Sequence, residues 1–348
     1  MINKYNKNKV TICIPSFNSK LFLKKTVESI LSQNFKNYDI FFFDNCSTDN
    51  TKDIIDHYIS RFSNFRKFIR KKNIIGENHI NKILKKKNLF GEYFCIFHSD
   101  DIYDKNILNL SINFLKKNLD CCAVSSTANI IDINDNIYSK TLLPKEISNK
   151  KFFKLDISLF HKFLFEGGNF LVSPSFVFRT KSFILNDYKY KYKKYKKACD
   201  VDFFNQILEK EKIAIINKNL LNYRISNYSF TGQDLEYRTK DSHLFLVLND
   251  ILKGYKYLDY NKYLFYLKKF KFLLMIDRAR QLINSKSLKI KSKIILNISD
   301  NLITAFESYK NIKYLIYILF IRIFIYFPFS RFIIKKIIIL RRHIYLYI

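Results

Sequence analysis

Short apolar runs alternate with amphipathic stretches in the first hundred residues of the chain. Val10–Pro15, Asp39–Phe43 and Tyr93–Phe97 have strand length, and Tyr93–Phe97 suits a strand covered on both faces. In Leu21–Gln33 apolar residues recur at three- and four-residue spacing, which predicts an amphipathic helix, and a second helix is predicted at Asn50–Arg61. This order of elements predicts parallel strands joined by right-handed crossovers.

The remaining elements are less regular. A charged connection is expected at Lys140–Lys154, and the glycine-led segment Gly167–Pro174 is either a simple turn or one wall of a binding site. From Glu236 onward the chain changes to long segments rich in Lys, Tyr, Phe and Leu. The later predicted helices are Ile80–Leu89, Asn106–Lys117, Val201–Lys210, Leu244–Leu252 and Tyr263–Ile283, and the later predicted strands are Ala123–Ile131 and Ser175–Phe178.

Polar residues follow each of the first three predicted strands. Asp44 ends the second strand, and Ser47 or Thr48 is expected to cap the helix that follows. The third strand ends in His98-Ser-Asp-Asp101. Because ligands bind beyond the carboxyl ends of strands in open α/β sheets, we expect these residues to meet at one ligand-binding edge.

The adjacent carboxylates Asp100 and Asp101 repel each other beside the core, so folding alone does not account for them. A divalent cation does, since Mg²⁺ and Mn²⁺ prefer carboxylate oxygens and bridge phosphates. The alternative is a solvated acidic turn. No GxGxxG follows the first strand and no GxxxxGK[ST] occurs, so a nucleotide here would be held by Asp44 and strand-end backbone, and its diphosphate by a metal.

A second acidic pair, Asp200 and Asp202, lies at the start of a predicted helix. One interpretation of Asp200 is a helix N-cap, and the other is a general base, and one carboxylate can serve both purposes.

The chain has 348 residues, enough for one large domain and a smaller one, and a formal net charge of +31. Lys, Asn, Ile, Phe and Tyr are abundant and Trp is absent, which is the bias of an AT-rich genome, so the charge is a weak functional signal. The six cysteines lack CxxC spacing and predict buried thiols in a reducing compartment. The polar stretch Met1–Lys9 has no apolar signal core, so a cytoplasmic location is expected.

Taken together, the motifs resemble the inverting family 2 glycosyltransferases with a GT-A fold, over roughly Val10 to Thr231. The resemblance is carried by Val10-Thr-Ile-Cys-Ile-Pro-Ser-Phe-Asn18, Gln33-Asn-Phe-Lys-Asn-Tyr-Asp-Ile40, Phe43-Asp-Asn-Cys-Ser-Thr-Asp-Asn-Thr51, Gly91-Glu-Tyr93, His98-Ser-Asp-Asp101, Cys199-Asp-Val-Asp202 and Tyr223-Arg224.

The resemblance implies an α/β GT-A domain over residues 1–235 and a basic, hydrophobic α-helical region over residues 236–348. It places the catalytic base in the pair Asp200 and Asp202, with Asp200 preferred. It implies that Mn²⁺ or Mg²⁺ binds at Asp100, with His98 and Asp101 as further candidates. The residues implied in binding the nucleotide donor are Pro15, Phe17, Asn18, Asp44, Ser99, Asp100 and Arg224.

Two positions depart from the family pattern. His98 stands at the first acidic position of the DXD motif, as a Mn²⁺ ligand or as a residue that hydrogen-bonds to the ligands. Ser226 stands where the family's late motif often has histidine.

The implied activity is inverting transfer of a sugar from a nucleoside-diphosphate donor, favoured as a UDP-sugar, to a hydroxyl of a saccharide or lipid-linked saccharide in surface polysaccharide synthesis. The alternative is a catalytically silent basic protein that binds membrane or nucleic acid; the enzyme interpretation expects no nucleic-acid partner. Basic and aromatic residues in Ile312–Ile348 favour attachment to the inner face of the cytoplasmic membrane, ahead of packing on the protein or on a second subunit, and ahead of spanning.

Overall fold

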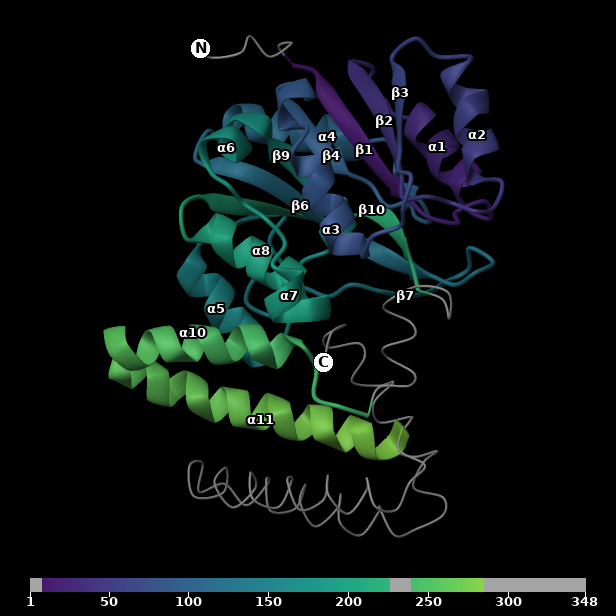
Figure 1. Cartoon of the computed structure of the whole chain (residues 1–348). Helices are drawn as coiled ribbons and strands as arrows, with labels where there is room; N and C mark the ends of the chain where they lie inside the picture. Colours follow the sequence, from purple (N-terminus) through teal and green to yellow (C-terminus); the bar gives the residue numbers. More distant parts are fainter. Residues whose placement is uncertain (1–7, 226–238, 285–348) are drawn as a thin grey trace. The chain divides into compact units, whose positions relative to one another are not determined.

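The computed structural model describes residues 8–225 and 239–284, with its elements labelled in Figure 1. The chain divides into two compact units, one made of residues 1–157 and 171–225 and the other of residues 158–170 and 226–348. The first unit holds the β-sheet, and the helices described for the second are α5, α10 and α11. The predicted segment Ile312–Ile348 and Ser226 lie outside the described residues.

A ten-stranded sheet forms in the first unit, with a central order β3-β2-β1-β4-β9-β6-β10-β5; β7 pairs with β6, and β8 with β10. The bounds of the strands are β1 Val10–Ser16, β2 Tyr38–Asp44, β3 Phe65–Ile69, β4 Tyr93–Ile96, β5 Ile102–Tyr103, β6 Cys121–Ile131, β7 Ile137–Lys140, β8 Phe152–Leu155, β9 Val177–Arg179 and β10 Lys212–Arg224.

The predicted parallel arrangement of the first strands is confirmed. β1 pairs in parallel with β2 on one side and β4 on the other, and β2 pairs in parallel with β3. In this register Ser16 lies opposite Asp44, so the carboxyl ends of β1 and β2 are level. β9 pairs antiparallel with both β4 and β6, which makes the sheet mixed rather than purely parallel.

Helices alternate with these strands, as expected from the apolar periodicity. The inward residues of α1 (Leu23, Val27 and Ile30) belong to one buried cluster with apolar residues of the strands. The bounds of the helices are α1 Leu23–Leu31, α2 Thr51–Ile59, α3 Gly76–Leu84, α4 Ile107–Lys117, α5 Ile157–Gly167, α6 Thr180–Leu185, α7 Tyr192–Tyr195, α8 Cys199–Leu208, α10 Leu244–Leu258 and α11 Tyr260–Asn284.

Gly91 allows β4 to enter beside β1. A Cβ at this position would lie 2.4 Å from the carbonyl oxygen of Lys9, which is closer than real Cβ contacts come. The Gly91 amide donates a hydrogen bond to Thr11 Oγ1 at 2.9 Å. The amide of Tyr93, the first residue of β4, donates to the carbonyl oxygen of Lys9 at 3.0 Å. The glycine that precedes the third predicted strand is therefore needed for close approach of two backbones.

Several local predictions differ from the structure. The helix expected at Ile80–Leu89 begins earlier, at Gly76, and ends at Leu84. The expected connection Lys140–Lys154 contains the start of β8, and the helix α5 that follows was not predicted. The strand β10 was also missed, because the polar triplet Asn217–Asn219 interrupts its apolar run; register shifts against β6 accommodate this triplet.

In the second unit α10 and α11 extend the two helices predicted at Leu244–Leu252 and Tyr263–Ile283. Within this unit Tyr266 of α11 stacks on Phe165, and Lys269 forms a 2.7 Å ion pair with Glu166, both from α5. None of the helices within residues 8–225 and 239–284 has both the length and the apolar character needed to cross a bilayer.

The cysteines are free, and five of the six, all except Cys46, are buried. This agrees with the prediction of buried thiols, except at Cys46.

Candidate functional site

The three strands β1, β2 and β4 deliver their polar ends to one edge of the sheet, as predicted. Because both neighbours of β1 run parallel to it, the loops after Ser16, Asp44 and Ile96 all begin on the same side. Hydrogen bonds join these loops directly. The hydroxyl oxygens of Ser19 and Ser99, which follow β1 and β4, lie 2.8 Å apart, and both residues are buried.

Asp44 organises the loop after β2. Its side chain is fully buried, and its carboxylate accepts hydrogen bonds from the Ser47 amide at 2.9 Å and from the Ser47 hydroxyl. The Ser47 hydroxyl oxygen accepts a 3.0 Å hydrogen bond from the amide of Asn18, in the loop after β1. Asp44 therefore positions the first loop through Ser47, a link that the sequence did not reveal.

The loop after β1 has a second set of contacts to the same segment. Asn18 Oδ1 accepts from the Thr48 amide at 2.9 Å, and Ser19 donates its amide to Thr51 Oγ1 at 2.7 Å. Asn18 has a positive φ of 48°, a conformation that asparagine tolerates better than most residues. These contacts hold the loop, in which Phe17 remains 49% exposed. Pro15 is half-buried in β1.

The expected helix cap after β2 is corrected by the structure. Neither Ser47 nor Thr48 caps α2, because Ser47 is turned to Asp44 and Thr48 to Asn18. Asp49 takes the role near this terminus: its Oδ1 accepts from the Thr51 amide at 3.0 Å.

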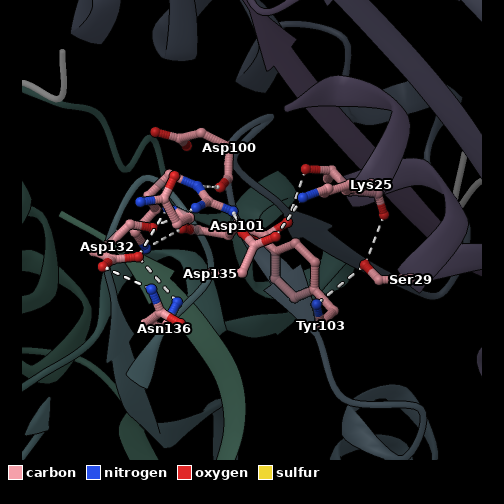
Figure 2. Close-up of polar contacts among 11 residues, drawn as sticks. Lys25, Ser29, Asp100, Asp101, Tyr103, Asp132, Asp135 and Asn136 are labelled. Carbon is pink, nitrogen blue, oxygen red and sulfur yellow. Dashed lines mark hydrogen bonds and ion pairs between the residues drawn. The ribbon is translucent and has the colours of Figure 1, made fainter. Parts of the chain in front are cut away.

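The loop after β4 brings together the three candidate metal ligands. One ligand atom from each of His98, Asp100 and Asp101 lies within 4.8 Å of the others. The backbone amide of His98 donates to the hydroxyl of Tyr103 at 2.7 Å, and the Tyr103 ring stacks on Phe97 at 3.8 Å. The cluster is therefore built on a fixed turn; Figure 2 shows Asp100, Asp101 and Tyr103 in it.

Burial of the two carboxyl groups outweighs the favourable charge of Arg224 beside them. Burial raises the pKa of Asp100, and burial together with the adjacent Asp100 raises the pKa of Asp101 well above its ordinary value. Burial also lowers the pKa of His98. Asp101 Oδ2 is buried and has no hydrogen-bond partner among the residues that the structure describes. An orphaned carboxylate oxygen beside a second carboxylate and an imidazole is a donor set that fits a divalent cation.

Arg224 lies against the same turn. The side chain is only 1% exposed, and its Nε donates to the carbonyl oxygen of Asp100 at 2.8 Å. Its backbone amide donates to Asp101 Oδ1, also at 2.8 Å. The contacts seen for Arg224 are thus internal to the protein, and its expected contact with a donor stays a prediction.

Asp200 and Asp202 lie in the first turn of α8, and their surroundings differ. Asp202 is 4% exposed; its Oδ2 accepts a 2.6 Å hydrogen bond from Gln206 and forms a 3.5 Å ion pair with Lys191. Asp200 is half-buried, and its Oδ1 accepts from the Val201 amide at 2.8 Å. Asp202 is therefore committed to neighbouring side chains, whereas Asp200 is more available to a substrate.

The position of Asp200 also removes one interpretation of it. The helix begins at Cys199 after an Ala198 cap residue, so Asp200 is not the N-cap. Burial raises its pKa to about 6, and the like charge of Glu77, at the start of α3, contributes. A carboxyl group that titrates near neutral pH is suited to accept a proton from a substrate hydroxyl.

Not all the predicted site residues are in direct contact. Within residues 8–225 and 239–284, Asp200 forms no hydrogen bond or ion pair with His98, Asp100 or Asp101. Other polar residues at this site, including Ser47, Lys25, Asp132 and Asp135, were missed by sequence reasoning. Asp132 and Asp135 follow the predicted strand Ala123–Ile131, but nothing in the sequence indicates which buried side chain they contact.

Comparison with known proteins agrees with this arrangement. Residues 11–183 match the family model described as Glycosyl transferase family 2. One similar protein is the teichuronic acid biosynthesis glycosyltransferase TuaG of Bacillus subtilis, 29% identical over 118 residues, which cover 34% of this chain and 45% of that protein. Another is the GalNAc(5)-diNAcBac-PP-undecaprenol beta-1,3-glucosyltransferase of Campylobacter jejuni, 27% identical over 93 residues, covering 27% of this chain and 30% of that protein.

Among solved structures, that of S. aureus TarS 1-349 in complex with UDP-GlcNAc is similar, with a TM-score of 0.51 and 15% identity over 86% of this chain and 73% of that one. The matches to the two sequence relatives span less than half of each relative's length. The structural likeness shows the fold alone, and it confirms the GT-A architecture expected from the motifs.

Proposed function

Because the chain belongs to glycosyl transferase family 2, we propose that it transfers a sugar, with inversion, from a UDP-sugar to a hydroxyl of a saccharide or lipid-linked saccharide. The observation that carries this proposal is the cluster of His98, Asp100 and Asp101 at the edge where the loops after β1, β2 and β4 are hydrogen-bonded together. We assign the catalytic chemistry to residues 1–235. The relatives support a role in surface polysaccharide synthesis, since one is named for teichuronic acid biosynthesis.

The donor's nucleotide is assigned to the loops after β1 and β2. The exposed ring of Phe17 offers a flat apolar face to a base, beside Pro15 and Asn18. Asp44, through Ser47, fixes the backbone that faces the base, and its carboxylate has acceptor capacity for a ring N–H. Uracil is the favoured base, because its ring N–H is a donor; thymine and guanine also offer ring N–H donors. Ser99 ties the donor loop to the turn that carries Asp100.

The diphosphate is assigned to the turn after β4. Asp100 and Asp101, with His98, would hold Mn²⁺ or Mg²⁺, which supplies Lewis-acid neutralisation of the charge on the leaving diphosphate. The protein's own contribution is to present these side chains on a turn that Arg224 and Tyr103 fix in place. Such preorganisation is the usual source of electrostatic stabilisation in enzymes.

We assign Asp200 as the general base that accepts the proton of the acceptor hydroxyl. The acceptor oxygen forms a bond to the anomeric carbon while the bond from that carbon to the diphosphate oxygen breaks. The hydroxyl proton passes to the Asp200 carboxylate, and the electron pair leaves with the diphosphate. A single displacement of this kind inverts the anomeric carbon. Asp202 is the less favourable base, because Gln206 and Lys191 already occupy one of its oxygens.

A membrane-surface location at the inner face of the cytoplasmic membrane completes the proposal. It is supported by the basic and aromatic composition of residues 312–348, and by the relative whose name specifies an undecaprenol-linked substrate. We expect the full chain to float with phosphatidylglycerol vesicles, not with phosphatidylcholine vesicles, and to be released by salt. If a chain that ends at Asn311 remained fully vesicle-bound, the assignment to residues 312–348 would be wrong.

The donor proposal is tested by calorimetric titration of the full chain with UDP, with and without Mn²⁺. We expect UDP to bind, and to bind more tightly with the metal present. If UDP, GDP and dTDP all fail to bind in both conditions, the donor proposal is wrong and the alternative of a catalytically silent basic protein is favoured.

Asp44→Ala is expected to raise the KM for the donor about tenfold or more, because a hydrogen bond to a charged group contributes ~1.5–3 kcal/mol. Steady-state kinetics with varied donor concentration measures this. Ser47→Ala is the informative partner, since it breaks the link to Asn18 but keeps the carboxylate. If Asp44 acts through Ser47, both variants raise KM; if it contacts the base directly, only Asp44→Ala does. An unchanged KM in Asp44→Ala would remove Asp44 from the donor site.

A further inference from the structure

Arg224 contacts the metal-ligand turn at two points without occupying the Asp100 carboxylate or the Oδ2 atom of Asp101. The residue lies at the carboxyl end of β10, opposite Ile131 of β6. Its Nε donates to the Asp100 carbonyl and its backbone amide to Asp101 Oδ1, both at 2.8 Å. Neither contact uses the Asp100 carboxylate or Asp101 Oδ2. Arg224 therefore orients these two residues without competing with a cation for them.

The far side of the same guanidinium is held by the turn between β6 and β7. Arg224 Nη1 donates to the carbonyl oxygen of Asp132, and Nη2 donates to Asp135 Oδ1, both at 2.5 Å. The guanidinium also lies over the ring of Phe22, 4.4 Å from its centroid. Figure 2 shows how Asp132 and Asp135 converge on the region that contains Asp100 and Asp101. A buried arginine requires such charge compensation, because an unpaired buried charge is strongly unfavourable.

The β6–β7 turn is itself preorganised. Asp132 Oδ1 accepts from the amides of Asn134 and Asn136 at 2.8 and 2.9 Å, and its Oδ2 accepts from the Asn136 side chain at 3.2 Å. This network lets Asp135 adopt a positive φ of 70°. Asp135 is thereby presented toward Arg224 by the local hydrogen bonds of its own turn.

A second positively charged side chain, that of Lys25 in α1, also binds Asp135. Lys25 Nζ forms an ion pair with Asp135 Oδ2, so one carboxylate bridges two positive side chains. Burial alone would raise the pKa of Asp135, but the hydrogen bonds from Lys25 and Arg224 outweigh it and lower the pKa. The neighbouring residue of α1, Thr26, donates its hydroxyl to the carbonyl of Asp101 at 2.8 Å. Helix α1 and the β6–β7 turn thus meet on the same metal-ligand turn.

We propose that Lys25, Asp135 and Arg224 form a clamp that holds Asp100 and Asp101 in the arrangement that binds a divalent cation. Asp135 and Lys25 are positioning residues in this clamp, acting on the ligands through Arg224. The inference rests on the proposed function, because it assumes the cation site. Without the Asp135 carboxylate, Arg224 would be left short of charge compensation, and its contacts with Asp100 and Asp101 would weaken.

The test measures binding of Mn²⁺ alone to the full chain, by calorimetry, for wild type, Asp135→Asn and Lys25→Met. Asp135→Asn is expected to weaken Mn²⁺ affinity about tenfold, the scale found when groups that orient metal ligands are removed. The matched control is Asp120→Asn. Asp120 also bridges two lysines, Lys154 at 2.8 Å and Lys212 at 3.5 Å, but its pairs lie outside the clamp. This control is expected to bind Mn²⁺ as wild type does.

Lys25→Met keeps the test decisive if Asp135→Asn does not fold, because the Lys25 side chain is 56% exposed. This variant is expected to weaken Mn²⁺ binding less than Asp135→Asn does, because Asp135 keeps its ion pair with Arg224. In transfer assays both variants should need more Mn²⁺ for half-maximal rate, yet approach the wild-type kcat at saturating Mn²⁺. A general loss of stability would not be rescued by metal in this way.

Three results separate the possibilities. If wild type binds Mn²⁺ and folded Asp135→Asn and Lys25→Met bind it equally well, the clamp is overturned while the cation site stands. If Asp120→Asn weakens binding as much as Asp135→Asn, the effect is not specific to the clamp, and the inference is again overturned. If wild type binds no Mn²⁺, the cation site fails and the clamp fails with it, while UDP binding still tests the donor site.

Discussion

Asp200→Asn is expected to lower kcat for sugar transfer by about 10²–10⁴-fold, the usual contribution of a positioned general base. Asparagine cannot accept the proton of the acceptor hydroxyl. Its side-chain oxygen can still accept the 2.8 Å hydrogen bond from the Val201 amide, so the first turn of α8 should keep its structure. Affinity for UDP, measured by calorimetry, should therefore change little while turnover with donor and acceptor is lost.

Asp202→Asn is the matched comparison, because the two carboxylates lie in the same helical turn. Asp202 is paired with Gln206 and Lys191, so its replacement should affect stability more than catalysis. A thermal melt and a kcat measurement on each variant distinguish these effects. Wild-type turnover in Asp200→Asn, with loss in Asp202→Asn, would transfer the role of base to Asp202.

The pH profile gives the same prediction a second readout. Burial raises the pKa of Asp200 to about 6, and a base must be ionised to act. The rate should therefore fall as pH decreases through about 6, approaching tenfold per pH unit below it, whereas an unperturbed aspartate would stay ionised to about pH 4. Glu77→Gln removes the like charge beside Asp200 and should move this acid limb to lower pH. An acid limb that stays in place in Asp200→Asn would belong to another group.

The parallel core of the sheet could be predicted because its signals are local. Val10–Ser16 and Tyr93–Ile96 are apolar runs, and the residues of α1 repeat with helical period, so each element is visible within its own sequence. The polar residues at the ends of these strands then follow from parallel pairing. The position of Asp100 and Asp101 at this edge follows from their place after a strand, whereas His98 was a candidate ligand through the resemblance to the DXD motif.

The rest of the site depends on contacts between distant segments, which a local pattern does not contain. β10 is a strand because β6 pairs with it, despite the polar triplet Asn217–Asn219. Nothing in the local sequence distinguishes Asp135 from other aspartates in turns. Its contact with Arg224, 89 positions away in the sequence, is formed only by the fold. Asp44 was predicted to be a donor-site residue, but its hydrogen bonds to Ser47 became visible only with the loop geometry.

Asp100→Ala is expected to abolish the effect of Mn²⁺ on UDP binding and to lower the transfer rate by about 10²–10⁴-fold, because metal-ion stabilisation of a leaving group contributes several kcal/mol. The variant is selective for a structural reason: Arg224 contacts the backbone carbonyl of Asp100, so removing the carboxylate leaves that contact in place. Asp187→Ala, which removes a carboxylate that is 81% exposed, is the control and should behave as wild type.

Calorimetric titration with UDP, with and without Mn²⁺, measures the metal effect directly for Asp100→Ala. Metal-free UDP affinity should stay at the wild-type value, since the loops after β1 and β2 are not altered. Asp101 Oδ2, which is buried and has no hydrogen-bond partner among the described residues, would then have lost its companion ligand. Full metal dependence in the folded Asp100→Ala protein would show that the cation binds elsewhere. It would also leave the half-buried Asp100 and the buried Asp101 without an assigned function.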